Sequence, residues 1–251
     1  MAEHVRAGAR DAGGRRRGGG LLVGLMGVIG ELLITAAVVL ALFAVWQLYW
    51  TTWEVEGPRA QQVAQFEQEH AAAEGLGERH TDDPPAVQPP ADGAVYGVLH
   101  VPSWDWMKMP LAQGTTNAVL DLGYAGHYVE TAQPGEVGNF SVAGHRRTYG
   151  NNFRHIDRLA QGDKVVVEVA DTYYVYRVET HEIVSPDAVW VVAPVPGDKT
   201  FSEQPTQRWM TMTTCHPEYS NTERYIVHLL FESWTPKSTG VPQELLDEPT
   251  D

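Results

Sequence analysis

Three residues of this 251-residue chain have side chains and positions suited to acyl transfer: Cys215, Arg224 and His145. Cys215 ends the run RWMTMTTC, Arg224 opens the next apolar run nine residues later, and His145 follows NFSVAG. A thiolate attacks an amide carbonyl, and a nearby histidine can take the thiol proton and return one to the leaving amine. An arginine close to the sulfur can stabilise the negative oxygen of the tetrahedral intermediate.

Residue type and spacing alone leave other interpretations open. Cys215 is the only cysteine, and a lone cysteine is commonly a small buried hydrophobe. His145 is one of ten histidines, so a chance Cys–His pair is easy, and Arg224 can be a surface cation. A single cysteine excludes an internal disulfide and a zinc site of two Cys and two His.

The charge of the chain is unevenly distributed. Residues 1–20 hold five arginines and two acids, whereas residues 51–251 hold 13 basic and 29 acidic residues. An acidic body repels nucleic acid, because such affinity depends on cations that neutralise phosphates, so no nucleic-acid partner is expected. The acidic loop residues show no calcium-ligand spacing, and we expect no metal and no cofactor. These loop acids are Asp157, Asp163 and Asp198.

The elements that must position the three residues have the character of strands. Short runs rich in Val, Ile, Tyr, Phe and Thr recur between about residues 94 and 234, separated by glycine and proline. They predict a single all-β barrel of about eight strands, whose ends can meet at one rim. Short helices are expected at 115–120 and 153–159. The predicted strands are 95–101, 139–143, 164–169, 172–184, 208–214 and 224–232.

Residues 21–50 are apolar apart from Glu31 and predict a membrane anchor helix over 21–53. A spanning part at about 32–50 leaves Glu31 near one interface, with Trp46, Tyr49, Trp50 and Trp53 at the other. The arginine-rich arm at 1–20 then lies in the cytoplasm and the rest outside the cell, by the positive-inside rule. A cleaved signal peptide is disfavoured, because the apolar run is too long.

The segments on either side of the predicted barrel, 93–235, are polar. Residues 54–92 are acidic and contain four prolines between 84 and 90, which predicts an extracellular linker that holds the barrel away from the bilayer. A short helix at about 61–74 is possible within it. Residues 236–251 are predicted to form a polar, disordered tail.

The motifs around the three residues resemble those of the sortase family. TMTTCHP at 211–217 is similar to the family's T-L-x-T-C motif, with Met212 in place of leucine, and GHR at 144–146 to its histidine motif. Arg224 stands where the family has its arginine. The resemblance implies an eight-stranded sortase barrel with His145, Cys215 and Arg224 as catalytic residues. It also implies cleavage of a C-terminal sorting signal between Thr and Gly, through a Cys215 thioester, and transfer of the acyl group to a cell-wall amine.

Finer features resemble class E sortases of high-GC Gram-positive bacteria: VAGHRRTYG, TTCHPEYS, and GHY followed by PG. That likeness implies a sorting signal of the form LAXTG, related to LPXTG, and a pocket tyrosine that selects it. Tyr128 is our candidate, with Thr213 and Thr214 as further substrate-binding residues. The implied partners are surface proteins that carry the signal, the amine of a lipid II-type peptidoglycan precursor, and the membrane that holds this single-pass enzyme.

Two alternatives remain at the level of the sequence. A hydrolytic cysteine peptidase would use the same residues but pass the acyl group to water. A non-catalytic, membrane-tethered β-domain would hold an inert Cys215. An L,D-transpeptidase also uses Cys and His, but HPEYS after Cys215 does not resemble that family's motif.

Overall fold

The computed structural model describes residues 19–249, and these divide between Trp46 and Gln47 into two compact units. Residues 1–18 of the predicted cytoplasmic arm lie outside the described residues. The first unit consists of helix α1 (Gly19–Val45), and a π-helical turn, η1 (Trp46–Trp50), follows it. Within α1, Val23–Val45 is long and apolar enough to cross a membrane, with a mean hydropathy of 2.6. This stretch begins nine residues before the span expected at 32–50, and it contains Glu31.

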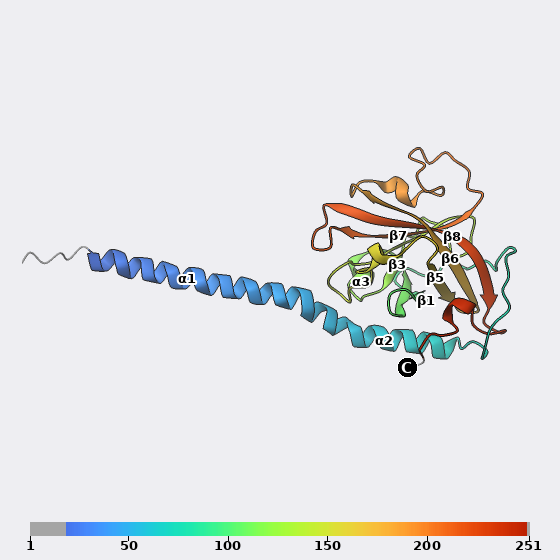
Figure 1. Cartoon of the computed structure of the whole chain (residues 1–251), viewed down its shortest axis with the longest axis horizontal. Helices are drawn as coiled ribbons and strands as arrows, with labels where there is room; N and C mark the ends of the chain where they lie inside the picture. Colours follow the sequence, from blue (N-terminus) through green and yellow to red (C-terminus); the bar gives the residue numbers. More distant parts are fainter. Residues whose placement is uncertain (1–18, 250–251) are drawn as a thin grey trace, which may run out of the picture. The chain divides into compact units, whose positions relative to one another are not determined.

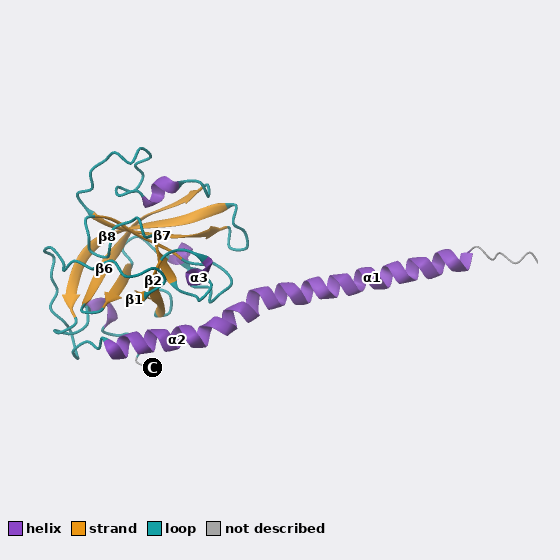
Figure 2. Ribbon diagram, turned by 180° about the vertical axis from the view of Figure 1, so that it is seen from behind, coloured by secondary structure: helices purple, strands orange, loops and turns teal. Residues whose placement is uncertain are grey.

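The second unit contains the predicted all-β fold, an eight-stranded closed barrel (Figures 1 and 2). Around the barrel the strands run in the order β1-β2-β3-β4-β7-β8-β6-β5. The strands are β1 (Val95–Val101), β2 (Met107–Gln113), β3 (Ala125–His127), β4 (Gly138–Ala143), β5 (Lys164–Val169), β6 (Thr172–Val184), β7 (Arg208–His216) and β8 (Glu223–Pro236). The short helices are α3 (Asn117–Leu120), η2 (Ile156–Arg158), η3 (Val189–Val192) and η4 (Gln243–Leu245).

Two strands, β2 and β3, were not among the runs predicted from sequence. The sequence of β2, MKMPLAQ, lacks β-branched and aromatic residues and contains Pro110. It nevertheless pairs with β1, where Pro110 lies opposite Val98. Strand β3 has only three residues and pairs parallel with β2. Their pairing partners make these segments strands, because tertiary context overrides a weak local preference.

Alternation along β7 and β8 gives the barrel wall two faces. Met210 and Met212 of β7 pack into the barrel core together with Val227 and Leu229 of β8. Successive side chains of a strand point to opposite faces, so Thr211, Thr213 and Cys215 lie on the outer face. The same argument puts Arg224, Ile226 and His228 of β8 on that outer face. A site built on these two strands therefore lies outside the barrel core.

The segment predicted as a linker differs from that expectation, because its first part is a long helix packed on the barrel. Helix α2 (Thr51–Glu69) contacts β1 and β2, and it buries Val63 and Phe66 against Val98. The chain beyond it also stays on the barrel, where His80 forms a bridge with Trp234. Val63 and Phe66 are the two large apolar side chains of α2 that are buried, which is too sparse a stripe to recognise in the sequence.

The predicted disordered tail is likewise docked on the barrel, as far as residue 249. Leu245 of η4 is buried against Val166, Tyr173 and Val175. Beyond it, the Glu248 carboxylate lies 3.0 Å from Nδ1 of His100 on β1. The tail is polar in composition, but one leucine and one carboxylate are enough to give it fixed partners.

A partly buried group of charges joins α2, the barrel and the tail. His100 contacts Glu168 through Nε2 at 2.8 Å and Glu248 through Nδ1, Lys237 pairs with Glu168, and Lys108 lies 3.1 Å from Glu67. Ligand atoms of Glu67, His100 and Glu168 lie within 4.8 Å of one another, a spacing that metal sites share. However, the two lysines already neutralise these carboxylates, and both ring nitrogens of His100 are engaged. The group is therefore a charge cluster of three cations and three anions when His100 is protonated.

The protonation of His100 makes the stability of this assembly pH-dependent. Burial opposes the charged form, but hydrogen bonds to Glu168 and Glu248 and their negative charges outweigh it and raise the pKa of His100 to about 9. A pKa raised above its ordinary 6.5 stabilises the fold fully below about pH 6.5, and this stabilisation is lost as the pH rises through about 9. Thermal unfolding followed from about pH 6 to 10 is expected to show that decline.

The matched variants are His100→Gln and His155→Gln, the latter at a partly exposed histidine outside the cluster. His100→Gln should be less stable than the wild type near pH 6 and should converge with it at high pH. The melting temperature of His155→Gln should fall with pH as that of the wild type does. If the melting temperature of His100→Gln fell with pH to the same extent as the wild type, the pH dependence would originate from another group.

Candidate active site

The register of three adjacent strands brings the three predicted catalytic residues to one end of the barrel wall. Strands β7 and β8 pair antiparallel with Cys215 opposite Arg224. Strand β4 pairs parallel with β7, with Ala143 opposite Thr213. His145 follows Ala143 by two residues, as Cys215 follows Thr213, so the parallel alignment brings His145 to the level of Cys215. The loop after β4, the end of β7 and the start of β8 therefore meet, as expected.

Cys215 and Arg224 are both partly exposed. Partial exposure removes the interpretation of Cys215 as a core thiol. The Arg224 guanidinium donates from Nη1 to the backbone carbonyls of Asn221 at 2.8 Å and Glu223 at 2.9 Å, which tie it to the turn before β8. Among the described residues, no acidic side chain pairs with Arg224, so its charge remains available to an oxyanion.

His145 is held from several sides. Its Nε2 lies 2.8 Å from a carboxylate oxygen of Asp121, and the ring of Tyr149 packs beside it at 5.4 Å between centroids. The His145 carbonyl accepts a hydrogen bond from the amide of Phe153. Gly144 is needed before it, because a Cβ there would lie 2.8 Å from the ring of Phe153. The glycine lets this loop pass directly over the aromatic ring.

The loop after His145 has an unusual backbone and is supported by α2. Thr148, Tyr149 and Asn151 all have positive φ, a conformation that costs energy for residues other than glycine. Arg59 of α2 donates to the Gly150 carbonyl at 3.1 Å and to the Asn152 side chain at 2.6 Å. The helix that was expected to be a linker thus stabilises the loop that carries His145.

The two predicted threonines have different environments. Thr213 lies on the outer face of β7, where its hydroxyl is 3.0 Å from the Tyr128 hydroxyl. Thr214 is buried and donates its hydroxyl to the Gly144 carbonyl at 2.7 Å. Thr214 therefore ties the strand of Cys215 to the loop of His145 and, unlike Thr213, lines neither pocket described below.

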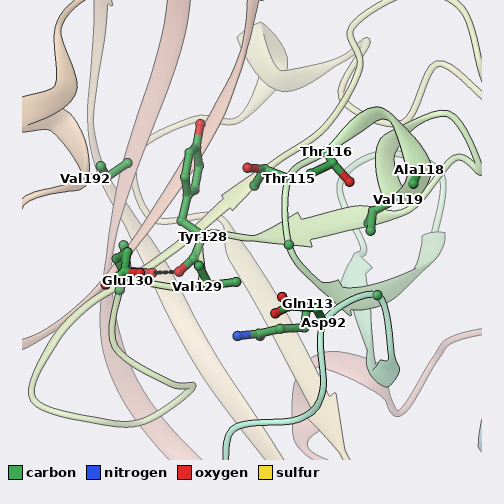
Figure 3. A pocket seen from close by; sticks show the side chains of 13 residues that line it. Asp92, Gln113, Thr115, Thr116, Ala118, Val119, Tyr128, Val129, Glu130 and Val192 are labelled. Atoms are coloured by element: carbon green, nitrogen blue, oxygen red, sulfur yellow. Dashed lines mark hydrogen bonds between the residues drawn. The ribbon is translucent and has the colours of Figure 1, made fainter.

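Tyr128 and Val192 line two pockets. One, of about 200 Å³, is lined by Tyr128, Thr213, Arg224 and Ile226, together with the segment 184–192 that covers them. The other, of about 510 Å³, is lined by the same two residues together with Thr115, Thr116 and Val119. Figure 3 shows Tyr128 in that larger pocket, between Val192 and Thr115. Tyr128 is therefore common to both pockets, and Arg224 lines only the smaller one.

The position of Tyr128 is set by its neighbour His127, which is buried. Nδ1 of His127 lies 2.8 Å from the Gln113 side chain, and Nε2 lies 3.0 Å from the Ala132 carbonyl. Burial lowers the pKa of His127 to about 4, although the hydrogen bond to Ala132 acts against this shift. A neutral His127 thus holds the β3–β4 turn in one conformation at neutral pH.

The fold and the arrangement of the site identify the class of protein. The Sortase domain family matches residues 99–230, and the chain belongs to the sortase family of cysteine transpeptidases. It is 33% identical to Sortase SrtE2 of Streptomyces coelicolor over 231 residues, 90% of this chain and 89% of that protein. It is 36% identical to Sortase SrtE1 of the same organism over 239 residues, 92% of this chain but 64% of that protein.

Solved structures agree with the predicted class E likeness and with the barrel. The SrtA sortase of Actinomyces oris is 45% identical, with a TM-score of 0.64 over 69% of this chain and 99% of that chain. Sortase E1 of Streptomyces coelicolor, solved with a tripeptide in the active site, is 39% identical. Its TM-score is 0.56 over 63% of this chain and 99% of that chain.

Two polar residues at this site, Asp121 and Arg146, were not predicted from the sequence. Asp121 contacts His145 but lies 24 residues before it, with no pattern that links the two. Arg146 is buried and donates to Nδ1 of His216 at 2.7 Å and to Asp157 at 2.9 Å. Because arginine only donates, Nδ1 of His216 must accept, which fixes the residue after Cys215. The one sequence feature that could have pointed to Arg146 is its place in the GHR motif, directly after His145.

Proposed function

We propose that this protein is a membrane-anchored sortase that cleaves an LAXTG-like sorting signal between Thr and Gly and joins the acyl group to a cell-wall amine. The observation that carries the proposal is the register of β4, β7 and β8, in which Cys215 lies opposite Arg224, and Arg224 lines a pocket together with Tyr128. Identity to class E sortases supports the same assignment.

In this mechanism His145 takes the proton of the Cys215 thiol, and the sulfur attacks the threonine carbonyl carbon of the sorting signal. Arg224 stabilises the negative oxygen that forms, and His145 gives a proton to the glycine nitrogen as the carbon–nitrogen bond breaks. A thioester on Cys215 remains. The acceptor amine then attacks the thioester carbonyl, gives up a proton to His145, and leaves an amide as the carbon–sulfur bond breaks.

The proposed location is the outer side of the cell membrane, with α1 as a single-pass anchor. One apolar helix near the N-terminus has the length that a span requires. Five arginines precede it and favour a cytoplasmic N-terminus. The proposed partners are surface proteins that carry the sorting signal and a lipid II-type amine.

Mass spectrometry of the products tests the proposed reaction. The protein is incubated with LAXTG and LPXTG peptides, with and without an amine acceptor such as triglycine. Cleavage between Thr and Gly with an amine-dependent ligation product supports the proposal. Hydrolysis products alone in the presence of amine would instead indicate a cysteine peptidase, and intact peptides would indicate a different substrate.

Tyr128 is proposed as the residue that selects alanine over proline in the signal. Because it lines the same pocket as Arg224 and bonds to Thr213, Tyr128→Ala should lower the ratio of LAXTG to LPXTG turnover by about 10-fold, within the discrimination that pocket contacts provide. Tyr128→Phe removes only the hydroxyl and should have a smaller effect. The kcat/KM values of both peptides measure this ratio. An unchanged ratio in Tyr128→Ala would exclude a selective role.

A further inference from the structure

The group that holds His145 most directly is a carboxylate that the three-residue mechanism does not use. Asp121 Oδ1 lies 2.8 Å from His145 Nε2, with the two side chains 30% and 26% exposed. An ionised carboxylate can only accept hydrogen bonds, so Nε2 must carry a hydrogen that it donates to Asp121. The nitrogen that remains for proton transfer with the sulfur or the substrate is Nδ1.

Asp121 is itself held in place. It caps the C-terminal end of α3, where its backbone amide donates to the Asn117 carbonyl at 3.0 Å. Helix α3 packs tightly on β3, because a Cβ at Gly126 would lie 2.8 Å from Leu120. Close packing on a barrel strand fixes the carboxylate relative to the site.

The charge of Asp121 is not committed to another partner. Within residues 19–249, no lysine or arginine pairs with it, so its electrostatic effect acts on His145. The ring of Tyr149 covers His145 and fixes the plane of the imidazole. The His145 ring thus contacts Asp121 after α3 and Tyr149 of its own loop, and Arg146 and Arg147 follow it in the chain. The strand register brings Cys215 and Arg224 to the same end of the barrel wall.

We propose that Asp121 is a positioning residue for His145, which selects the Nε2–H tautomer and stabilises the imidazolium that protonates the leaving glycine amine. The contact holds Nε2 of His145 against the carboxylate and leaves Nδ1 as the nitrogen for proton transfer. This inference rests on the proposed roles of His145 and Cys215, and it adds a fourth side chain to the site.

The test compares Asp121→Asn, which keeps the shape but removes the charge, with Asp121→Glu and the matched control Asp171→Asn at an exposed turn. With a cleaved peptide, Asp121→Asn should lower kcat by about 10- to 100-fold at little change in KM, since the general acid loses orientation and charge. Asp121→Glu should recover part of the loss, and Asp171→Asn should match the wild type. Thermal unfolding measures whether each variant is folded.

Alkylation of Cys215 by iodoacetamide at one fixed pH provides a readout that needs no substrate. Asp121→Asn should be alkylated about 10-fold more slowly than the wild type, because His145 loses the group that orients it as a proton acceptor. A wild-type alkylation rate together with wild-type kcat in a folded Asp121→Asn variant would overturn the proposal. Slower alkylation without any peptide cleavage, even by the wild type, would support Asp121 while contradicting the proposed substrate.

Discussion

Replacing Cys215 by alanine is expected to abolish both peptide cleavage and formation of a trapped acyl-enzyme. The sulfur is the atom to which the acyl group is transferred, so no other group in the site can replace it. The chain has one cysteine, and an acyl adduct on the intact protein therefore reports on this residue alone. Intact-protein mass spectrometry after incubation with an LAXTG peptide measures the adduct.

Cys215→Ser is the matched variant, because it keeps the size of the side chain but replaces the thiol by a weakly ionising hydroxyl. It should fold as the wild type does and turn over the peptide at least about 100-fold more slowly. Since the site is partly exposed, neither substitution should change the melting temperature by much. Retained turnover in Cys215→Ala would rule out this residue as the nucleophile and reopen the non-catalytic interpretation.

Replacing Arg224 by lysine should lower kcat by about 100- to 1,000-fold, the cost of removing one donor from an oxyanion site. Lysine keeps the charge but loses the planar guanidinium, which in this structure is held by the carbonyls of Asn221 and Glu223. A flexible ammonium has no equivalent fixed geometry. Pre-steady-state acylation with the same peptide measures the step at which the oxyanion forms.

The control for this prediction is Arg79→Lys, at a half-exposed arginine that pairs with Glu232 away from the site. It should acylate at the wild-type rate. Arg224→Lys should still be alkylated at Cys215, which would separate a lost oxyanion contact from a damaged thiol. Wild-type acylation by Arg224→Lys would exclude the oxyanion role and leave Arg224 as a residue of the turn.

Local sequence signals were sufficient for most of the barrel. Six of the eight strands coincide with runs of β-branched and aromatic residues, and Cys215 and Arg224 stand at the ends of two that pair. Strands β2 and β3 gave no such signal, because their conformation depends on partners elsewhere in the chain. The docking of α2 was not predicted either, because Val63 and Phe66 are two separate apolar residues in a polar segment. Only their contact with Val98 of β1 shows that they are buried.

By itself, the sequence determined the class of the fold, the apolar segment near the N-terminus and the choice of three candidate catalytic residues, each from a motif of a few neighbouring residues. Only the tertiary structure decided which groups surround those residues. It brings Asp121 to His145 across 24 residues and places the Thr213 hydroxyl beside that of Tyr128. It also buries Thr214, whose hydroxyl donates to the Gly144 carbonyl. Contacts of this kind depend on strand register and helix packing, which are set by the summed burial of the whole barrel and leave no local trace in the sequence.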